Sequence, residues 1–141
     1  MVGEAGRLVA WMTFRRRIPR PTRDEAERER RAREIGCLCC YLNEQQGLAA
    51  APSYDTKQHC NLGGLHGAPN LGERYTFILC AWHHCAILPE GWTTSAATDC
   101  FGPSLAKGSK PFRARYGSDE ELIALTDTLT GYQPCAPTSP A

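Results

Sequence analysis

The chain has 141 residues, enough for one domain and too few for a multidomain enzyme. Only 42% of the residues are hydrophobic, and 13 Gly with 10 Pro indicate a loop-rich body whose thin core needs disulfides or a metal. The formal net charge of +1 excludes a strongly basic or acidic chain and identifies no partner by itself. The 8 cysteines can supply either kind of crosslink.

The N-terminal residues indicate the cell compartment, and the compartment decides whether disulfides or a metal is expected. The apolar stretch at residues 8–14 is short, lacks a small-residue cleavage site and runs directly into Arg15, so it is a poor signal peptide. No stretch has the length of a transmembrane helix. We therefore expect a cytoplasmic protein with no membrane partner, in which close cysteine pairs more often bind metal than form disulfides. A disulfide scaffold is the alternative.

Residues 1–33 are predicted to form a basic arm and a polar helix. Thr22 and Glu25 have capping-box spacing, and they open a helix over residues 23–35 that Gly36 ends. Because few of its positions are apolar, this helix either packs weakly or lies along a partner. A basic arm before it often contacts phosphates, and a solvated leader is an equal alternative. The clustered basic residues are Arg15, Arg16, Arg17, Arg20 and Arg23.

Residues 34–131 predict one small, loop-rich α+β domain. Residues 37–47 hold a first cysteine cluster, and residues 53–57 are irregular or a short strand. Residues 75–79 are β-branched, aromatic and apolar, and they form the best strand signal. A short helix over residues 81–88 follows. Further helices are predicted over residues 94–101, 109–116 and 120–130, the last opened by Ser118 and Glu121 at capping-box spacing, with a disordered tail at 132–141.

Two short motifs form the strongest constellation, Cys37-x-x-Cys40 and Cys80-x-x-His83. Two such pairs on separate turns present four ligands at the corners of a tetrahedron, which is the arrangement that a structural zinc requires. The spacing therefore predicts a zinc site. Three alternatives stay open: buried free cysteines, Cys39 in place of Cys37, and His84 in place of His83.

Two further histidines lie at the edges of this predicted zinc scaffold. His59 precedes a Gly-rich turn, and His84 follows His83 on the same short helix. A β-hairpin followed by a helix would bring His59 and His84 to one side. A histidine that is free to act as a base, beside a metal held by a helical histidine, is an arrangement for phosphodiester hydrolysis. Alternatively, His59 only makes a hydrogen bond within its loop.

Five motifs in a fixed order carry a family resemblance, and they are Gly36-Cys37-Leu38-Cys39-Cys40, Gln58-His59-Cys60-Asn61-Leu62-Gly63-Gly64, Leu79-Cys80-Ala81-Trp82-His83-His84, Gly102-Pro103-Ser104-Leu105-Ala106 and Phe112-Arg113-Ala114-Arg115-Tyr116-Gly117. This set resembles the HNH (ββα-metal) nucleases that carry a zinc knuckle. It is more similar still to the recombination-enhancement nucleases of bacteriophages and prophages, which act with the RecA recombinase. The resemblance covers about residues 34–130 and implies a ββα-metal core with a zinc knuckle, flanked by helices.

The resemblance implies a role for each site residue. His59 is the general base that activates water, and His84 is a helical ligand of a catalytic magnesium or manganese ion. Gln58 stands where the family usually has an Asp or His that binds this ion, so a neutral and weaker ligand is present here. Glu73 is an alternative ligand of the ion, although a solvated Glu is the simpler interpretation. The structural zinc ligands are Cys37, Cys40, Cys80 and His83.

The resemblance also implies DNA as the substrate and a RecA filament as a partner, in the cytoplasm of a bacterial host. Arg113 and Arg115 would grip flanking phosphates without reading sequence, and the arm residues Arg15, Arg16 and Arg17 would track the DNA. Two other functions stay open. One is a catalytically weak or inactive zinc-stabilised DNA-binding module, for which Gln58 argues, and the other is a purely structural zinc protein.

Overall fold

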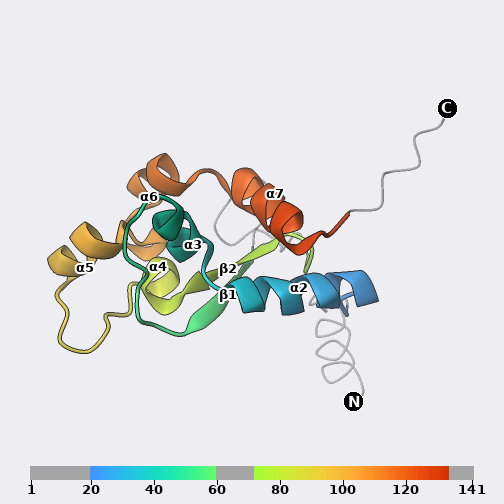
Figure 1. The fold of residues 1–141 in the computed structure, drawn as a ribbon, viewed down its shortest axis with the longest axis horizontal. Coiled ribbons are helices and arrows are strands. Elements are labelled where there is room, and N and C mark those ends of the chain that lie inside the picture. Colours follow the sequence, from blue (N-terminus) through green and yellow to red (C-terminus); the bar gives the residue numbers. More distant parts are fainter. Residues whose placement is uncertain (1–19, 60–71, 134–141) are drawn as a thin grey trace, which may run out of the picture.

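The computed structural model describes residues 20–59 and 72–133, and Figure 1 shows their arrangement. The elements in chain order are α2 (Arg23–Ile35), α3 (Leu38–Gln45), β1 (Asp55–His59), β2 (Thr76–Cys80), α4 (Ala81–Cys85), α5 (Thr94–Phe101), the 3-10 helix η2 (Leu105–Lys107), α6 (Ser109–Tyr116) and α7 (Asp119–Thr130). This is the small α+β fold that the sequence predicts. The predicted arm residues Arg15, Arg16 and Arg17, and residues 134–141 of the predicted tail, lie outside the described residues. Within those residues, every helix is too short or too polar to cross a membrane.

The helix ends that depend on nearby residues form as predicted. Thr22 and Glu25 make both bonds of a capping box at the start of α2, and Ser118 and Glu121 do the same for α7. Gly36 ends α2 with a φ of 85°, which a residue with a side chain rarely adopts. The predicted last helix begins one residue earlier than expected, within the usual uncertainty of helix boundaries.

Helix α2 is fixed to the rest of the fold by a charged side chain. Arg28 is only 2% exposed, and with Ala32 it forms the buried side of the helix, which contacts α7 and β2. Its guanidinium donates to Asp127 Oδ1 at 2.7 Å and to Thr76 Oγ1 at 3.3 Å. The polar helix therefore packs within this chain through a buried ion pair.

Helix α3 occupies the segment where the sequence predicts only a cysteine cluster. The sulfur of Cys37 replaces the usual oxygen at the N-cap and accepts the backbone N–H of Cys40 at 3.4 Å. Leu38 and Cys39 on the first turn are buried in the core. The helix was not predicted because a cysteine cap is not among the ordinary helix-start signals.

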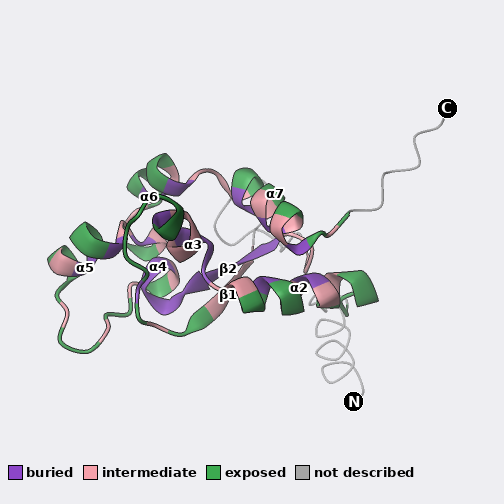
Figure 2. Ribbon diagram, viewed as in Figure 1, coloured by how far each residue is buried: buried purple, intermediate pink, exposed green. Residues whose placement is uncertain are grey.

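Strands β1 and β2 form an antiparallel hairpin at the centre of the fold, with Asp55 opposite Cys80 and His59 opposite Thr76. Every residue of β2 is buried, whereas β1 is largely half-buried (Figure 2). In Figure 1, α3 to α6 gather toward one end of the hairpin and α2 and α7 toward the other. Strand β2 begins and ends one residue later than predicted, and Cys80 thereby joins the strand directly to α4.

Helix α4 is shorter than the helix over residues 81–88 that the sequence predicts. It ends at Cys85 because Ala86 adopts the left-handed conformation, with a φ of 57°. The N–H of Ala86 then bonds to Trp82 O at 2.9 Å, and the N–H of Ile87 bonds to Ala81 O at 3.2 Å. These bonds satisfy the last carbonyl groups of the helix and turn the chain away.

The C-terminal helices α5 and α6 match their predicted bounds and close the core over α4. Gly102, between α5 and η2, lets the hydroxyl of Tyr116 lie close to the backbone, because a Cβ at this position would collide with that hydroxyl. Aromatic side chains fill this part of the core or pack against it, and they are Trp82, Trp92, Phe101, Phe112 and Tyr116.

Candidate metal centre and active site

Four side chains from two parts of the chain meet in one buried cluster. Cys37 and Cys40 come from the start of α3, and Cys80 and His83 from the start of α4. One ligand atom from each residue lies within 4.8 Å of all the others. Across residues 20–59 and 72–133, no other group of three or more His, Cys, Asp and Glu side chains gathers in this way.

The distances within this Cys3His cluster fit a tetrahedral zinc ion. His83 Nδ1 lies 3.1 Å from Cys80 Sγ, 3.5 Å from Cys37 Sγ and 3.6 Å from Cys40 Sγ. The Cys40 and Cys80 sulfurs are 3.9 Å apart. Ordinary zinc–sulfur and zinc–nitrogen bond lengths give tetrahedral edges of about 3.8 Å between sulfurs and about 3.6 Å between nitrogen and sulfur. The cluster can therefore hold zinc with little rearrangement.

The three thiols of the cluster differ in how easily they lose a proton. Burial raises the pKa of Cys37 well above its ordinary value, and contact with Cys37 and Cys80 raises the pKa of Cys40. The pKa of Cys80 is lowered because the Cys37 and Cys40 thiols donate to its sulfur. A cation bound by all three sulfurs would have to displace the protons that Cys37 and Cys40 hold in its absence.

A second set of contacts orients His83 rather than His84 toward the sulfurs. His83 is fully buried, and its Nε2 lies 2.7 Å from the carbonyl oxygen of Phe101. The Tyr116 hydroxyl and the Asn43 amide donate to the same oxygen at 2.8 and 2.7 Å. A proton on Nε2, held by this carbonyl, leaves Nδ1 with its lone pair facing the cluster, as metal-bound histidines require.

His84 points to the hairpin instead of the cluster. Its Nδ1 is 2.6 Å from Thr56 Oγ1, and the Thr56 hydroxyl donates to the carbonyl of Leu79 at 2.9 Å. A carbonyl can only accept, so the hydroxyl proton of Thr56 is used in the bond to Leu79. His84 must then donate from Nδ1 to the Thr56 oxygen. The lone pair of His84 is then on Nε2. Burial, followed by the nearby charge of His59, lowers the pKa of His84, and both effects favour the neutral ring that binds metals.

His59 is the last residue of β1 and faces a carboxylate. Its Nε2 lies 3.4 Å from Glu73 Oε1, and Lys57 Nζ lies 2.7 Å from Glu73 Oε2. The Glu73 side chain is only 14% exposed, so the expectation of a solvated Glu is wrong. These two contacts, neither of them visible in the sequence pattern, hold the turn just before β2 against the hairpin.

Gln58 occupies the strand position before His59, opposite Phe77. Its side-chain amide donates to the backbone carbonyl of His59 at 3.1 Å. Alternate residues of a strand share a face, so Gln58 lies on the same face as Thr56, which contacts His84. Gln58 and His84 therefore lie on one face of the hairpin. By the same alternation His59 lies with Lys57 on the other face, at the end of β1, where both contact Glu73.

The two predicted phosphate-binding arginines of α6 differ in their surroundings. Arg113 is held by Asp119, with 2.7 Å between Nη1 and Oδ1. Arg115 is exposed, and its guanidinium lies 6.0 Å from the ring centroid of Tyr116. Arg115 is therefore the more available of the two for a phosphate.

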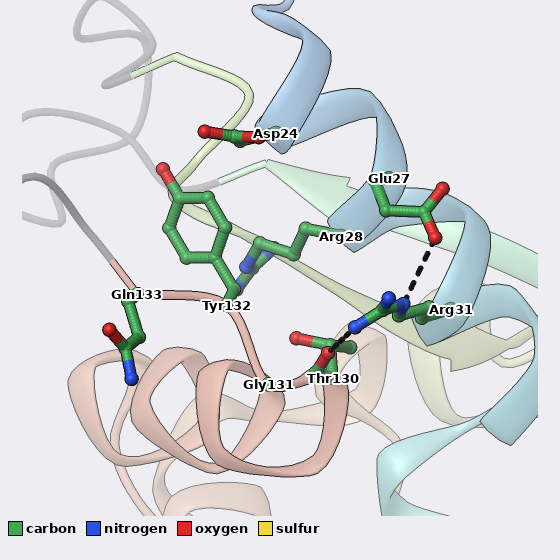
Figure 3. Close-up of a pocket in the computed structure, with 8 residues that line it drawn as sticks. All are labelled: Asp24, Glu27, Arg28, Arg31, Thr130, Gly131, Tyr132 and Gln133. Carbon is green, nitrogen blue, oxygen red and sulfur yellow. Dashed lines mark hydrogen bonds and ion pairs between the residues drawn. The ribbon is translucent and has the colours of Figure 1, made fainter.

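A cavity of about 300 Å³ lies apart from these residues, between α2 and the end of α7 (Figure 3). Its two arginines already have partners within the protein. Arg31 binds Glu27 at 3.0 Å and Thr130 O at 2.8 Å, and Arg28 binds Asp127. The cavity thus offers no unpaired cation for a phosphate. Its lining residues are Asp24, Glu27, Arg28, Arg31, Thr130, Gly131, Tyr132 and Gln133.

Comparison with known proteins agrees with the motifs and the metal cluster. The profile of one protein family, described as recombination enhancement, RecA-dependent nuclease, matches residues 21–130. No curated protein and no solved structure gives a significant match. The matched region runs from the start of α2 to the end of α7 and includes all four residues of the Cys3His cluster. The chain belongs to the family of recombination-enhancement, RecA-dependent nucleases.

Proposed function

We propose that this protein is a metal-dependent DNA endonuclease of the HNH type that acts in recombination together with RecA, in the cytoplasm of a bacterial host. The observation that carries the proposal is the β1–β2–α4 unit, in which one helix supplies His83 to the Cys3His cluster and turns His84 to the hairpin that ends in His59. This is the ββα arrangement that the family resemblance implies. The nuclease domain would comprise residues 34–131.

In this proposal zinc has a structural role. Cys37, Cys40, Cys80 and His83 would bind it and thereby join the start of α3 to the start of α4. The hairpin lies between these two pairs in the sequence, so the metal would fix both of its ends. Zinc would thus position the catalytic residues without contacting substrate.

His59 would act as the general base. It would take a proton from the water that attacks the scissile phosphorus in line with the leaving oxygen. His84, through Nε2, and Gln58, through its amide oxygen, would hold a magnesium or manganese ion. Such an ion, when bound, offsets charge on the phosphate and on the leaving oxygen. Arg115, Arg113 and the arm residues Arg15, Arg16 and Arg17 would hold the flanking phosphates of the DNA.

A cleavage assay tests this function. The full chain is incubated with single-stranded and double-stranded DNA and Mg²⁺ or Mn²⁺, with and without a RecA filament. Replacing the general base by His59→Ala should lower the cleavage rate by about 10²- to 10⁴-fold. Tyr54→Ala, at a 63% exposed side chain just before the same strand, is the matched control and should cut like the parent. If His59→Ala cuts as well as the parent, His59 is not the base.

A second function is favoured by one observation, the neutral amide of Gln58 where the family usually has a charged or imidazole ligand. Within the described residues, no second cluster of three metal-binding side chains compensates for it. The protein would then be a zinc-stabilised DNA-binding module with weak or no cleavage. Salt-dependent DNA binding without cleavage in either metal identifies this case, whereas no DNA affinity at low salt identifies a purely structural zinc protein.

A further inference from the structure

A series of side-chain contacts runs from Glu29 on α2 through Lys57 and Glu73 to His59. Glu29 Oε1 on α2 lies 2.6 Å from Lys57 Nζ on β1, and the same Nζ lies 2.7 Å from Glu73 Oε2. The other oxygen of Glu73 lies 3.4 Å from His59 Nε2. The Lys57 side chain is 19% exposed and the Glu73 side chain 14% exposed, so the contact between these two is the least exposed to water of the three.

We infer that Glu73 is a positioning residue that holds His59 in the tautomer with its proton on Nε2, so that Nδ1 keeps the lone pair that takes the proton from water. This inference rests on the proposed role of His59 as general base. A carboxylate can only accept hydrogen bonds, and a neutral imidazole carries one N–H and one lone pair. The partner of one ring nitrogen therefore decides what the other can do.

The charges around Glu73 keep it a carboxylate. Burial acts to raise the pKa of Glu73, but the hydrogen bonds and charges of Lys57 and His59 outweigh it and lower the pKa below its usual value. Lys57 is held in turn by Glu29, which Arg33 contacts at 3.3 Å. Among the described residues, the ring of His84 on α4 is a further titratable group close enough to His59 for the two to affect each other.

Lys57 allows only one orientation of an amide at position 73. In Glu73→Gln the oxygen must face Lys57, an ammonium group that can only donate. The NH₂ group then faces His59 Nε2, which must accept. The ring proton moves to Nδ1, and the nitrogen needed for the base is blocked, as happens when the orienting Asp of a Ser-His-Asp triad is changed to Asn.

The first test is nitrogen NMR of His59 in the zinc-loaded full chain, at a pH where the ring is neutral. It requires neither DNA nor a catalytic ion. The parent should carry the ring proton on Nε2, and Glu73→Gln should carry it on Nδ1. Glu90→Gln, the same change at an exposed carboxylate, should leave the tautomer as in the parent. A proton on Nδ1 in the parent, or the same tautomer in Glu73→Gln as in the parent, overturns the inference.

The second test is single-turnover cleavage. Glu73→Gln should lower the rate of the chemical step by about 100-fold or more without changing DNA affinity. The double variant Lys57→Met with Glu73→Gln frees the amide to turn its oxygen to His59, so it should recover the Nε2 tautomer and at least about tenfold of the lost rate. Glu73→Gln cleaving at the parent rate overturns the inference even if His59→Ala is inactive. A parent with the expected tautomer that cuts no DNA refutes the proposed nuclease and leaves the orientation of His59 by Glu73 supported.

Discussion

Cys37 and Cys80 each combine two roles in one side chain. Both belong to the Cys3His cluster, and both sulfurs accept the backbone N–H of the residue three positions later, Cys40 at 3.4 Å and His83 at 3.5 Å. A cysteine at a helix N-cap therefore places the next ligand on the first turn, beside it. This local geometry explains why the four cluster residues could be predicted from their spacing alone.

The first prediction concerns Cys80. Cys80→Ser keeps an N-cap oxygen but removes a zinc ligand, so its effect reports the metal rather than the cap. We expect zinc to fall well below one ion per chain and the free energy of unfolding to fall by about 4 kcal/mol or more. Elemental analysis and urea unfolding measure the two quantities. Cys85→Ser, at an exposed cysteine on the same helix, is the control and should retain zinc. Full zinc in Cys80→Ser would rule out the assigned ligand set.

Contacts between distant residues could not be predicted in the same way. Thr56 contacts His84 across 28 positions, and Glu73 contacts His59 across 14. The polar residues of β1 show no apolar alternation, so their faces were not assigned. With β1 known as a strand, alternation alone would have placed Thr56 and Gln58 on one face.

At the level of elements, helices and strands with signals in nearby residues could be predicted from the sequence, and those that depend on distant residues could not. The capping boxes of α2 and α7 lie within four residues, and both helices were predicted to within one residue. Strand β1 exists because it pairs with the buried strand β2, which its own sequence does not reveal. Helix α4 ends early at Ala86, where a left-handed alanine takes the place that Gly usually occupies.

The second prediction follows from that alanine. Ala86→Gly removes the cost of a left-handed conformation with a side chain, and it should raise the free energy of unfolding by about 0.5–1 kcal/mol. Ala81→Gly makes the same change within α4, where it should lower stability by about 1 kcal/mol or more. Urea unfolding of the two variants should therefore give shifts of opposite sign. Equal losses would mean that residue 86 does not adopt the left-handed conformation.

At the level of the whole molecule, polar side chains join α2 to α7 and to both strands of the hairpin. Arg28 binds Asp127 of α7 and Thr76 of β2, and Glu29 binds Lys57 of β1. Because its apolar positions are few, the sequence predicts a helix that either packs weakly or lies along a partner. The pairing of Arg28 with a residue 99 positions away is not a local signal. Packing of α2 therefore contributes to the stability of the fold, and through Glu29 it also supports the Lys57–Glu73 pair that contacts His59.

The third prediction concerns this docking. Arg28→Met should lower the free energy of unfolding by about 3 kcal/mol, because it leaves Asp127 without its partner in a largely buried place. Arg30→Met is the matched control on the same helix. Arg30 makes only exposed ion pairs, with Glu27 and Glu34, so its loss should leave the free energy of unfolding close to that of the parent. Urea unfolding measures both, and a similar small loss in the two variants would contradict the buried ion pair.

The helix starts at Cys37 and Cys80 have one more consequence. A zinc site of three thiolates and a neutral imidazole would carry one excess negative charge, and the amide dipoles of α3 and α4 would both direct their positive ends at it. Sulfur that accepts hydrogen bonds and faces positive dipoles is a poorer nucleophile. Peroxide or electrophiles should therefore modify the exposed thiol of Cys85 long before they release the metal.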